Sequence, residues 1–320
     1  MNQQECPACG AIIDGAPAVC PRCGRPLAVP GAEQLAGAQG DPLLAPAVPL
    51  RGESGGRLIL RAAARTHPGL VRASNEDSVL FIQLTGQLAG ASLAEPGFFA
   101  VADGMGGHDQ GEVASRRVLQ HLAAAVLDRV FKRVALTGRG ADQIWMERTL
   151  RDCILAANGE LMALQRASRS DMGTTLTAAL VIDGQAVVAN VGDSRTYLWR
   201  ASELRQITRD HSLVASLVAA GQLAPEAVYT HDQKAMIYRS IGESDNLAVD
   251  MFSLTLQPHD RLLLCSDGLW EMVRDEGVAE ALGASAEPQE TCDQLVAAAN
   301  SAGGEDNISV LTVWVAPAAE

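Results

Sequence analysis

Apolar stretches and turn residues follow one another closely from Arg57 to the end of the chain. Runs rich in Val, Ile, Leu and Phe, bounded by Gly, Asp and Asn, predict strands. The expected strands cover residues 57–66, 78–84, 98–103, 174–183, 185–192, 195–200, 203–208, 249–256, 260–267 and 307–315. Short turns join the four strands between residues 174 and 208, which is typical of a β-meander.

Two long stretches instead repeat their apolar positions at helical spacing. Residues 111–133 place Val118, Leu122, Val126 and Val130 along one face, and residues 141–168 form a second amphipathic helix. Shorter helices are expected within 211–228 and at 288–303. Strands in clusters and helices in long pairs favour an α+β fold with layered antiparallel sheets over strict βαβ alternation.

The first 24 residues contain two Cys-x-x-Cys pairs separated by ten residues. The four cysteines are Cys6, Cys9, Cys20 and Cys23. This spacing predicts one structural zinc ion in a knuckle of the zinc-ribbon type. Two disulfides are the alternative, and the lack of a secretion signal disfavours them. A segment this short cannot bury a core, so the metal must stabilise it.

Residues 25–56 change abruptly to Pro, Gly and Ala without a hydrophobic period. Such a composition predicts a flexible linker. We therefore expect three parts: a zinc-ribbon-like segment at 1–24, a linker at 25–56 and a large domain at 57–316.

Composition and charge narrow the classes of function. No run approaches the eighteen or so apolar residues of a membrane span, and the first residues lack the basic start and apolar core of a signal peptide. The net charge of −13 disfavours attraction to nucleic acid or to an anionic membrane. We expect a cytoplasmic protein, with Cys153, Cys265 and Cys292 as core thiols.

Four aspartates spread over about 200 residues carry the candidate chemistry: Asp103, Asp193, Asp267 and Asp306. Three of them follow apolar strands, in FFAVAD, AVVANVGD and RLLLCSD. A carboxylate at the end of a buried strand needs a cation to neutralise it. Together with the adjacent pair Glu76-Asp77, they predict one oxygen-rich pocket for hard divalent metals.

Two further features lie next to these carboxylates. Arg72 precedes Glu76 by four residues, and a guanidinium can bind two phosphate oxygens at once; a surface Arg-Glu pair is the alternative. Asp103 is followed by three glycines in four positions, which would let the backbone turn tightly around a metal. The Gly104 carbonyl could then be a further ligand, although a plain glycine turn explains the pattern equally well.

In number and order, these motifs resemble the PPM-type (protein phosphatase 2C-like) metal-dependent Ser/Thr protein phosphatases in their bacterial form. The resemblance runs from about Arg57 to Val315. It is carried by RASNEDS, FAVADGMGGHDQGEVAS, MGTTLTAAL, VGDSRTYLWR, ITRDHSLVASLVAAGQL, LLLCSDGLW and GGEDNISVLTV. It implies a four-layer α-β-β-α sandwich whose two antiparallel sheets carry a dinuclear Mg²⁺ or Mn²⁺ centre.

The resemblance also implies a role for each metal ligand. Asp103 would bridge both ions, the Gly104 carbonyl would bind one of them, and Asp267 and Asp306 would bind the other. Asp193 would contribute, with Asp267, to a third and weaker ion seen in bacterial members.

Three more residues complete the implied site. Glu76 would reach a metal through water, Asp77 would orient nearby water, and Arg72 would hold the substrate phosphate. Paired cations lower the pKa of a bridging water, so that hydroxide is present at neutral pH. This hydroxide would attack phosphorus directly, while the metals and Arg72 stabilise the charge on the phosphoryl oxygens.

The chain departs from the animal members at the position after the Asp-Gly pair. Those members have a histidine there, proposed as the general acid, whereas this chain has Met105. His108 lies three residues further on and is the candidate proton donor; a role in stabilising the glycine loop is the alternative. The stretch from about Leu213 to Ile241 corresponds to the flap that shapes substrate choice in bacterial relatives.

We therefore expect a monomeric phosphatase that acts on phosphorylated Ser/Thr proteins and reverses Ser/Thr kinase signalling. A pseudophosphatase is disfavoured because every matched metal position keeps its carboxylate. Nucleic-acid binding through the zinc segment is disfavoured because it has no aromatic residue and few basic ones, Arg22 within it and Arg25 directly after it. A docking role for this segment, toward a kinase or toward the phosphatase domain itself, is preferred.

Overall fold

The computed structural model describes residues 3–5, 12–14, 58–88, 91–92, 95–106, 110–138 and 140–318. The chain divides into two compact units, residues 1–53 and 54–320. In the first unit, β1 (Gln3–Glu5) and β2 (Ile12–Asp14) pair antiparallel. Cys6, Cys9, Cys20 and Cys23 lie outside the described residues, so the zinc segment stays a prediction.

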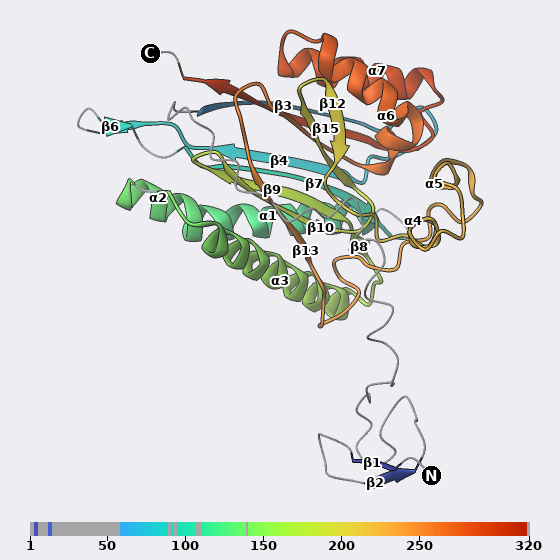
Figure 1. Cartoon of the computed structure of the whole chain (residues 1–320). Coiled ribbons are helices and arrows are strands. Elements are labelled where there is room, and N and C mark those ends of the chain that lie inside the picture. The colour runs from blue at the N-terminus through green and yellow to red at the C-terminus, as the bar shows by residue number, and fades with distance from the viewer. Residues whose placement is uncertain are drawn as a thin grey trace. The chain divides into compact units, whose positions relative to one another are not determined.

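Two antiparallel sheets form the centre of the second unit (Figure 1). The first has the order β13-β10-β9-β7-β4, with β8 beside β7. Its strands are β4 (Asp77–Gln83), β7 (Gly97–Met105), β8 (Gly173–Thr174), β9 (Leu176–Ile182), β10 (Gln185–Val191) and β13 (Asp250–Thr255). The second sheet has the order β12-β11-β14-β15-β3. Its strands are β3 (Leu58–His67), β11 (Arg195–Arg200), β12 (Glu203–Gln206), β14 (Arg261–Cys265) and β15 (Ile308–Pro317). A short pair, β5 (Gln87–Leu88) with β6 (Ala91–Ser92), stands apart from both.

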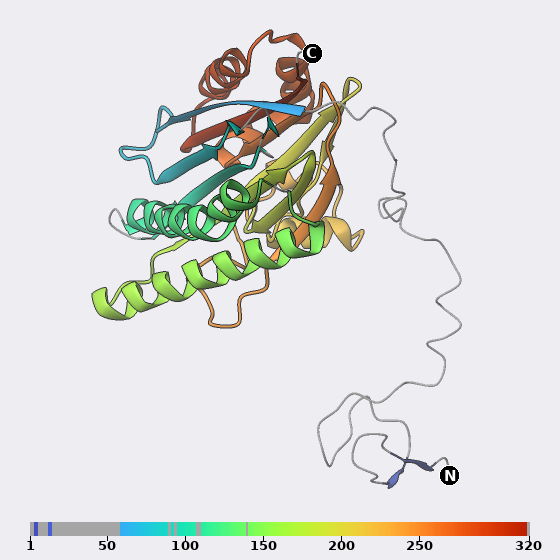
Figure 2. The same cartoon turned by 90° about the vertical axis from the view of Figure 1, so that its left-hand side faces the viewer.

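Helices cover the outer face of each sheet (Figures 1 and 2). The first sheet packs against α1 (Gln110–Val126) and α3 (Gln143–Ser168). A π-helical turn (Leu127–Phe131) continues α1 into α2 (Lys132–Thr137). The second sheet packs against α6 (Asp267–Ala284) and α7 (Pro288–Ser301). Two short helices, α4 (Leu213–Ala219) and α5 (Ala227–Thr230), lie in the excursion between β12 and β13.

Three layers of buried apolar side chains hold the four layers of secondary structure together. The first lies between α1, α3 and the inner strands, where Leu122, Leu150 and Leu180 are fully buried. The second lies between the two sheets and the third beneath α6 and α7. Because alternate residues of a strand face opposite sides, each inner strand contributes to two of these layers. The expected α+β, four-layer α-β-β-α sandwich is confirmed.

Two expectations for local structure were wrong. The β-meander is divided: β9 and β10 belong to the first sheet, whereas β11 and β12 belong to the second. The chain changes sheets at the Gly192-Asp193-Ser194 turn, where Gly192 has a φ of +103°. Helix α6 was also missed, because three glycines and a non-helical Arg274 interrupt its helical pattern.

The three cysteines of the second unit lie in its apolar interior. Cys153, Cys265 and Cys292 are buried free thiols, as predicted. Burial raises the pKa of Cys292 to about 11 and that of Cys265 further, so neither is a thiolate near neutral pH. Within the described part of the chain, no helix combines the length and the apolar character needed to cross a membrane.

The layer between the sheets should be sensitive to loss of volume. Phe99 on β7 is fully buried in this layer, so Phe99→Ala should lower the free energy of unfolding by about 3–5 kcal/mol. Leu136→Ala is the control, because Leu136 is 78% exposed and should change it by less than about 0.5 kcal/mol. Urea unfolding followed by circular dichroism measures both values; similar small losses would contradict the sandwich packing.

Candidate metal centre

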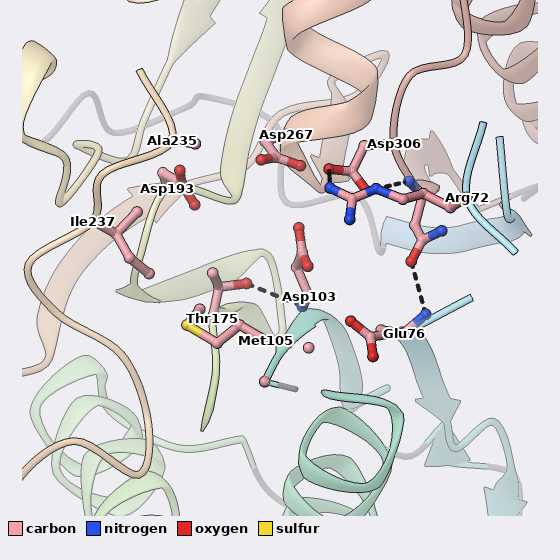
Figure 3. Close-up of a pocket in the computed structure, with 13 residues that line it drawn as sticks. Arg72, Glu76, Asp103, Met105, Thr175, Asp193, Ala235, Ile237, Asp267 and Asp306 are labelled. Atoms are coloured by element: carbon pink, nitrogen blue, oxygen red, sulfur yellow. Dashed lines mark hydrogen bonds and ion pairs between the residues drawn. The ribbon is translucent and has the colours of Figure 1, made fainter. Parts of the chain in front are cut away.

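A pocket of about 260 Å³ is lined by residues from both sheets and their connections (Figure 3). Its acidic lining residues are Glu76, Asp103, Asp193, Asp267 and Asp306. Arg72 is the only cation among the described residues that line it. The structure therefore brings together almost all the carboxylates that the sequence predicts for one site.

Asp103 lies inside β7, two residues before its end, and its backbone is held on both sides. Its N–H donates to the Thr175 hydroxyl oxygen at 3.0 Å, and its carbonyl accepts from the Thr174 hydroxyl at 2.8 Å. Gly104 and Met105 pair with β8 and extend the strand, and because residues 107–109 lie outside the described residues, the glycine turn stays a prediction. A side chain at Gly104 would collide with the Gly111 carbonyl oxygen, so only glycine fits there.

Asp77 lies directly opposite Asp103 in the register of β4 and β7. It is 7% exposed and is absent from the pocket lining, so it stands behind the carboxylates that face the cavity. One of its oxygens, Oδ2, accepts from the Ser266 hydroxyl at 2.7 Å, while Oδ1 is buried without a hydrogen-bond partner. Its neighbour Glu76 does line the pocket, and the Glu76 N–H donates to Asn307 Oδ1 at 2.8 Å.

Asp193 lies between β10 and β11, whereas Asp267 follows β14. One side chain, Trp270, links these two parts of the chain. Asp267 is the first residue of α6, where the helix dipole stabilises negative charge. Asp193 lies in the turn at which the chain changes sheets. Trp270, on the first turn of α6, donates from Nε1 to the Asp193 carbonyl oxygen at 3.0 Å. The indole thereby fixes the position of Asp193 relative to Asp267.

Arg72 and Asp306 form an ion pair at the rim of the pocket. The guanidinium Nη2 lies 2.6 Å from Asp306 Oδ2, and the Arg72 side chain is 57% exposed. Exposed pairs of this kind contribute at most about 1 kcal/mol, so an incoming phosphate can compete for the guanidinium. Hydrogen bonding to Asp306 raises the pKa of Arg72 and keeps it charged.

The clustered carboxylates repel one another. Loss of solvation and then repulsion among Asp77, Asp193 and Asp267 raise the pKa of Asp103 well above its usual value. Loss of solvation followed by repulsion from Asp193 raises the pKa of Asp267 in the same way. For Asp77 and Asp193, too, loss of solvation is the largest cause of the shift. The pKa of Asp77 is raised to about 6 and that of Asp193 to about 7.

These residues fit divalent metal ions. A cation would offset the repulsion, and Asp267 Oδ1, buried without a hydrogen-bond partner, offers it an oxygen. No three His, Cys, Asp or Glu side chains in the described ranges already converge closely enough to hold one ion alone. Water would complete the coordination, as is usual for hard cations such as Mg²⁺.

The excursion between β12 and β13 forms one wall of the pocket. Ala235 and Ile237 line it, and Figure 3 shows them on the opposite side from Arg72. Lys234 fastens this segment to α6 through Glu271, with 2.6 Å between Nζ and Oε2. The predicted flap, from about Leu213 to Ile241, therefore contributes apolar side chains to the pocket.

Sequence reasoning missed the neutral side chains that hold the acidic ones. Thr175, Ser266, Trp270 and Asn307 all lie in motifs that carry the family resemblance, but no role was predicted for them. A hydroxyl, indole or amide next to a candidate ligand was the signal that could have identified them. His108 lies outside the described residues, and Met105 lines the pocket.

Residues 73–299 match the family model described as "Protein phosphatase 2C". The chain belongs to this family. Among its relatives, the serine/threonine phosphatase stp of Listeria innocua is 37% identical over 258 residues, covering 79% of this chain and 95% of the relative. The serine/threonine protein phosphatase PstP of Mycobacterium tuberculosis is 38% identical over 261 residues, covering 81% of this chain and 45% of the relative.

Solved structures of the family agree with the fold. A crystal structure of the M. tuberculosis phosphatase PstP/Ppp has a TM-score of 0.67 and 37% identity, covering 79% of this chain and 97% of that chain. The catalytic domain of PstP in complex with two manganese ions has a TM-score of 0.66 and 36% identity, covering 81% and 99%. The predicted enzyme class, a metal-dependent protein serine/threonine phosphatase, is confirmed.

The repulsion among the clustered carboxylates of the pocket can be measured through the thermal stability of the protein. In EDTA, Asp267→Asn should melt at a higher temperature than the unmodified protein, because it removes one of the clustered charges. Each tenfold increase in Mn²⁺ above its Kd should add about 1.4 kcal/mol per bound ion to the stability of the unmodified protein, or roughly 2–4 °C per ion. This Mn²⁺ response should be much smaller in Asp267→Asn.

Differential scanning fluorimetry with and without Mn²⁺ measures both effects. Asp128→Asn is the matched control, because Asp128 is exposed, pairs with Lys132 one helical turn away and does not line the pocket. A full Mn²⁺ response in Asp267→Asn would contradict the assignment of this carboxylate to the metal centre.

Proposed function

We propose that the pocket around Asp103 is the catalytic centre and hydrolyses phosphoserine and phosphothreonine in proteins. The observation that supports this most strongly is the convergence of five acidic residues beside a single arginine. Such a site favours cations within it and a phosphate dianion at its rim. Asp103, Asp267 and Asp306, with the Gly104 carbonyl, would hold two ions, and Asp193 with Asp267 would hold an optional third.

When bound, the divalent cations would lower the pKa of coordinated water and offset phosphate charge. Arg72 binds the phosphoryl oxygens and orients the group, exchanging its contact with Asp306 for one with the substrate. Glu76 and Asp77 lie beside and behind Asp103 and orient water by accepting hydrogen bonds. Thr175 and Ser266 keep Asp103 and Asp77 in place, so little reorganisation is needed when the substrate arrives.

The leaving oxygen of serine or threonine needs a proton. Met105 has none to donate, although it lines the pocket. His108 stays our candidate for the proton donor, on the basis of its position in the sequence three residues further on. None of the three described cysteines takes part as a nucleophile, since all three are buried with raised pKa values.

The relatives are named serine/threonine phosphatases, and this name suggests the substrate class. We propose that the substrates are phosphorylated Ser/Thr proteins and that the enzyme acts as a monomer in the cytoplasm to reverse the work of a Ser/Thr kinase. The net charge of −13 supports a role away from nucleic acid and anionic membranes.

We also propose that Cys6, Cys9, Cys20 and Cys23 bind one structural zinc ion. The spacing of the two Cys-x-x-Cys pairs supports this, as does the pairing of β1 with β2, which precede and follow the first cysteine pair in the sequence. The segment would be a docking module separated by the linker at 25–56 from the catalytic domain at 57–316.

Substitutions in the pocket test the catalytic role. With p-nitrophenyl phosphate and Mn²⁺, Asp103→Asn should lower kcat/KM by about 10³-fold or more, because it weakens the binding of the cations. Arg72→Ala should lower it by about 10²-fold, and Arg72→Lys by less, because lysine keeps the charge but not the bidentate geometry.

Arg116→Ala is the control for these measurements, because Arg116 pairs with Glu112 on the same helix, α1, and does not line the pocket. Turnover by Asp103→Asn equal to that of the unmodified protein would exclude this pocket as the catalytic centre. Binding of phosphopeptides without any turnover by the unmodified protein would instead support a pseudophosphatase.

The zinc segment can be tested separately. The purified protein should contain one equivalent of zinc by mass spectrometry, and Cys9→Ser should lose it. A variant that lacks residues 1–56 should keep its activity toward p-nitrophenyl phosphate within about twofold, because the catalytic domain has its own core. A full-length protein without zinc, or a deletion variant that fails to fold, would refute the division into two functional units.

A further inference from the structure

The loop between β3 and β4 presents two adjacent aliphatic side chains next to the arginine at the pocket rim. Leu70 is 66% exposed and Val71 is 69% exposed, and both directly precede Arg72. Single exposed apolar residues are ordinary on protein surfaces. Leu70 and Val71, however, are consecutive and directly precede Arg72, which lines the pocket. They form an apolar surface that a substrate would contact beside its phosphate.

This loop is held in place by the side chain of Asn307. Its amide nitrogen donates to the carbonyl oxygens of Pro68 at 3.0 Å and Ser74 at 2.9 Å, and its amide oxygen accepts from the Glu76 N–H at 2.8 Å. One side chain thus ties the two ends of the loop together. The residues between those ends, Leu70 and Val71 among them, are presented outward at a fixed place.

Two backbone features fix the loop further. The Leu70 N–H donates to the Gly304 carbonyl oxygen at 2.8 Å. Gly69 has a φ of +80°, and a side chain there would collide with the Asp306 carbonyl oxygen. Because these contacts already fix the backbone that carries the exposed apolar side chains, covering them costs less entropy than it would on a mobile loop.

The reach of the loop limits which substrate residues can touch it. Consecutive Cα atoms are about 3.8 Å apart, so the Cα of Leu70 lies within about 7.6 Å of that of Arg72. An extended peptide advances about 3.3 Å per residue. When the phosphate of a substrate contacts Arg72, residues one to three positions away are therefore within reach of Leu70 and Val71.

We propose that Leu70 and Val71 bind an aliphatic or aromatic side chain located one to three residues from the phosphorylated serine or threonine of the substrate protein. This inference rests on the proposed function, because it requires the phosphate at Arg72. The surface is continuous with that site, and it selects among phosphoproteins by the neighbours of the phosphorylated residue.

A set of phosphothreonine peptides tests the proposal with the full-length, Mn²⁺-loaded enzyme. Each peptide has one Leu at a position from three residues before to three residues after the phosphothreonine, with Gly and Ser elsewhere, and a reference peptide has no Leu. The unmodified enzyme should hydrolyse at least one Leu peptide with a kcat/KM roughly tenfold above the reference, equivalent to about 1.4 kcal/mol.

The double substitution Leu70→Ser with Val71→Ser should bring this ratio close to one. A ratio between two peptides within one variant is insensitive to differences in folding or metal loading. The control is Leu136→Ser with Ile144→Ser, because both residues are about 80% exposed on α2 and α3 and lie outside the pocket lining; it should keep the ratio.

The outcomes separate the two proposals. Equal hydrolysis of all peptides by the unmodified enzyme, or a preference that survives the double substitution, overturns this inference and leaves the proposed function standing. No turnover of any peptide or of p-nitrophenyl phosphate overturns the proposed function and this inference with it.

Discussion

Mutual repulsion among carboxylates in one pocket is the constraint around which the catalytic unit is organised. Asp77, Asp103, Asp193 and Asp267 all have raised pKa values because loss of solvation and like charges act together on them. Such a cluster persists only where the surrounding structure holds it. The three apolar layers of the sandwich stabilise the strands and turns from which these side chains project.

The details of this support explain why the acidic residues meet. Asp77 and Asp103 are brought together by the register of β4 and β7. Asp193 lies where the chain passes from one sheet to the other, and Trp270 joins its backbone to the helix that begins with Asp267. Asn307, the residue after Asp306, then binds both ends of the loop that carries Arg72. Residues far apart in the sequence thus share one cavity, where bound divalent cations would offset their charge.

Much of the architecture could be predicted from the sequence. Apolar alternation located most strands, the helical spacing located α1 and α3, and the order of the acidic motifs identified the family. The division of the strands between two sheets could not be predicted, because alternation shows which face of a strand is buried but not which neighbour it pairs with. Helix α6 was missed because its apolar face is interrupted by glycines, and tertiary packing rather than propensity stabilises it.

For the site, the charged residues were predictable and their supports were not. A carboxylate at a strand end is conspicuous because burial of charge is costly, whereas Thr175 or Asn307 is unremarkable until the structure shows what it holds. The position of Asp77 behind Asp103 likewise depends on strand register. The most direct test of the account is anomalous diffraction at the manganese absorption edge from crystals grown with Mn²⁺. We expect two strong peaks that share the Asp103 carboxylate, with Asp267 and Asp306 on one of them; manganese bound elsewhere, or absent from this pocket at saturating concentration, would contradict the central claim.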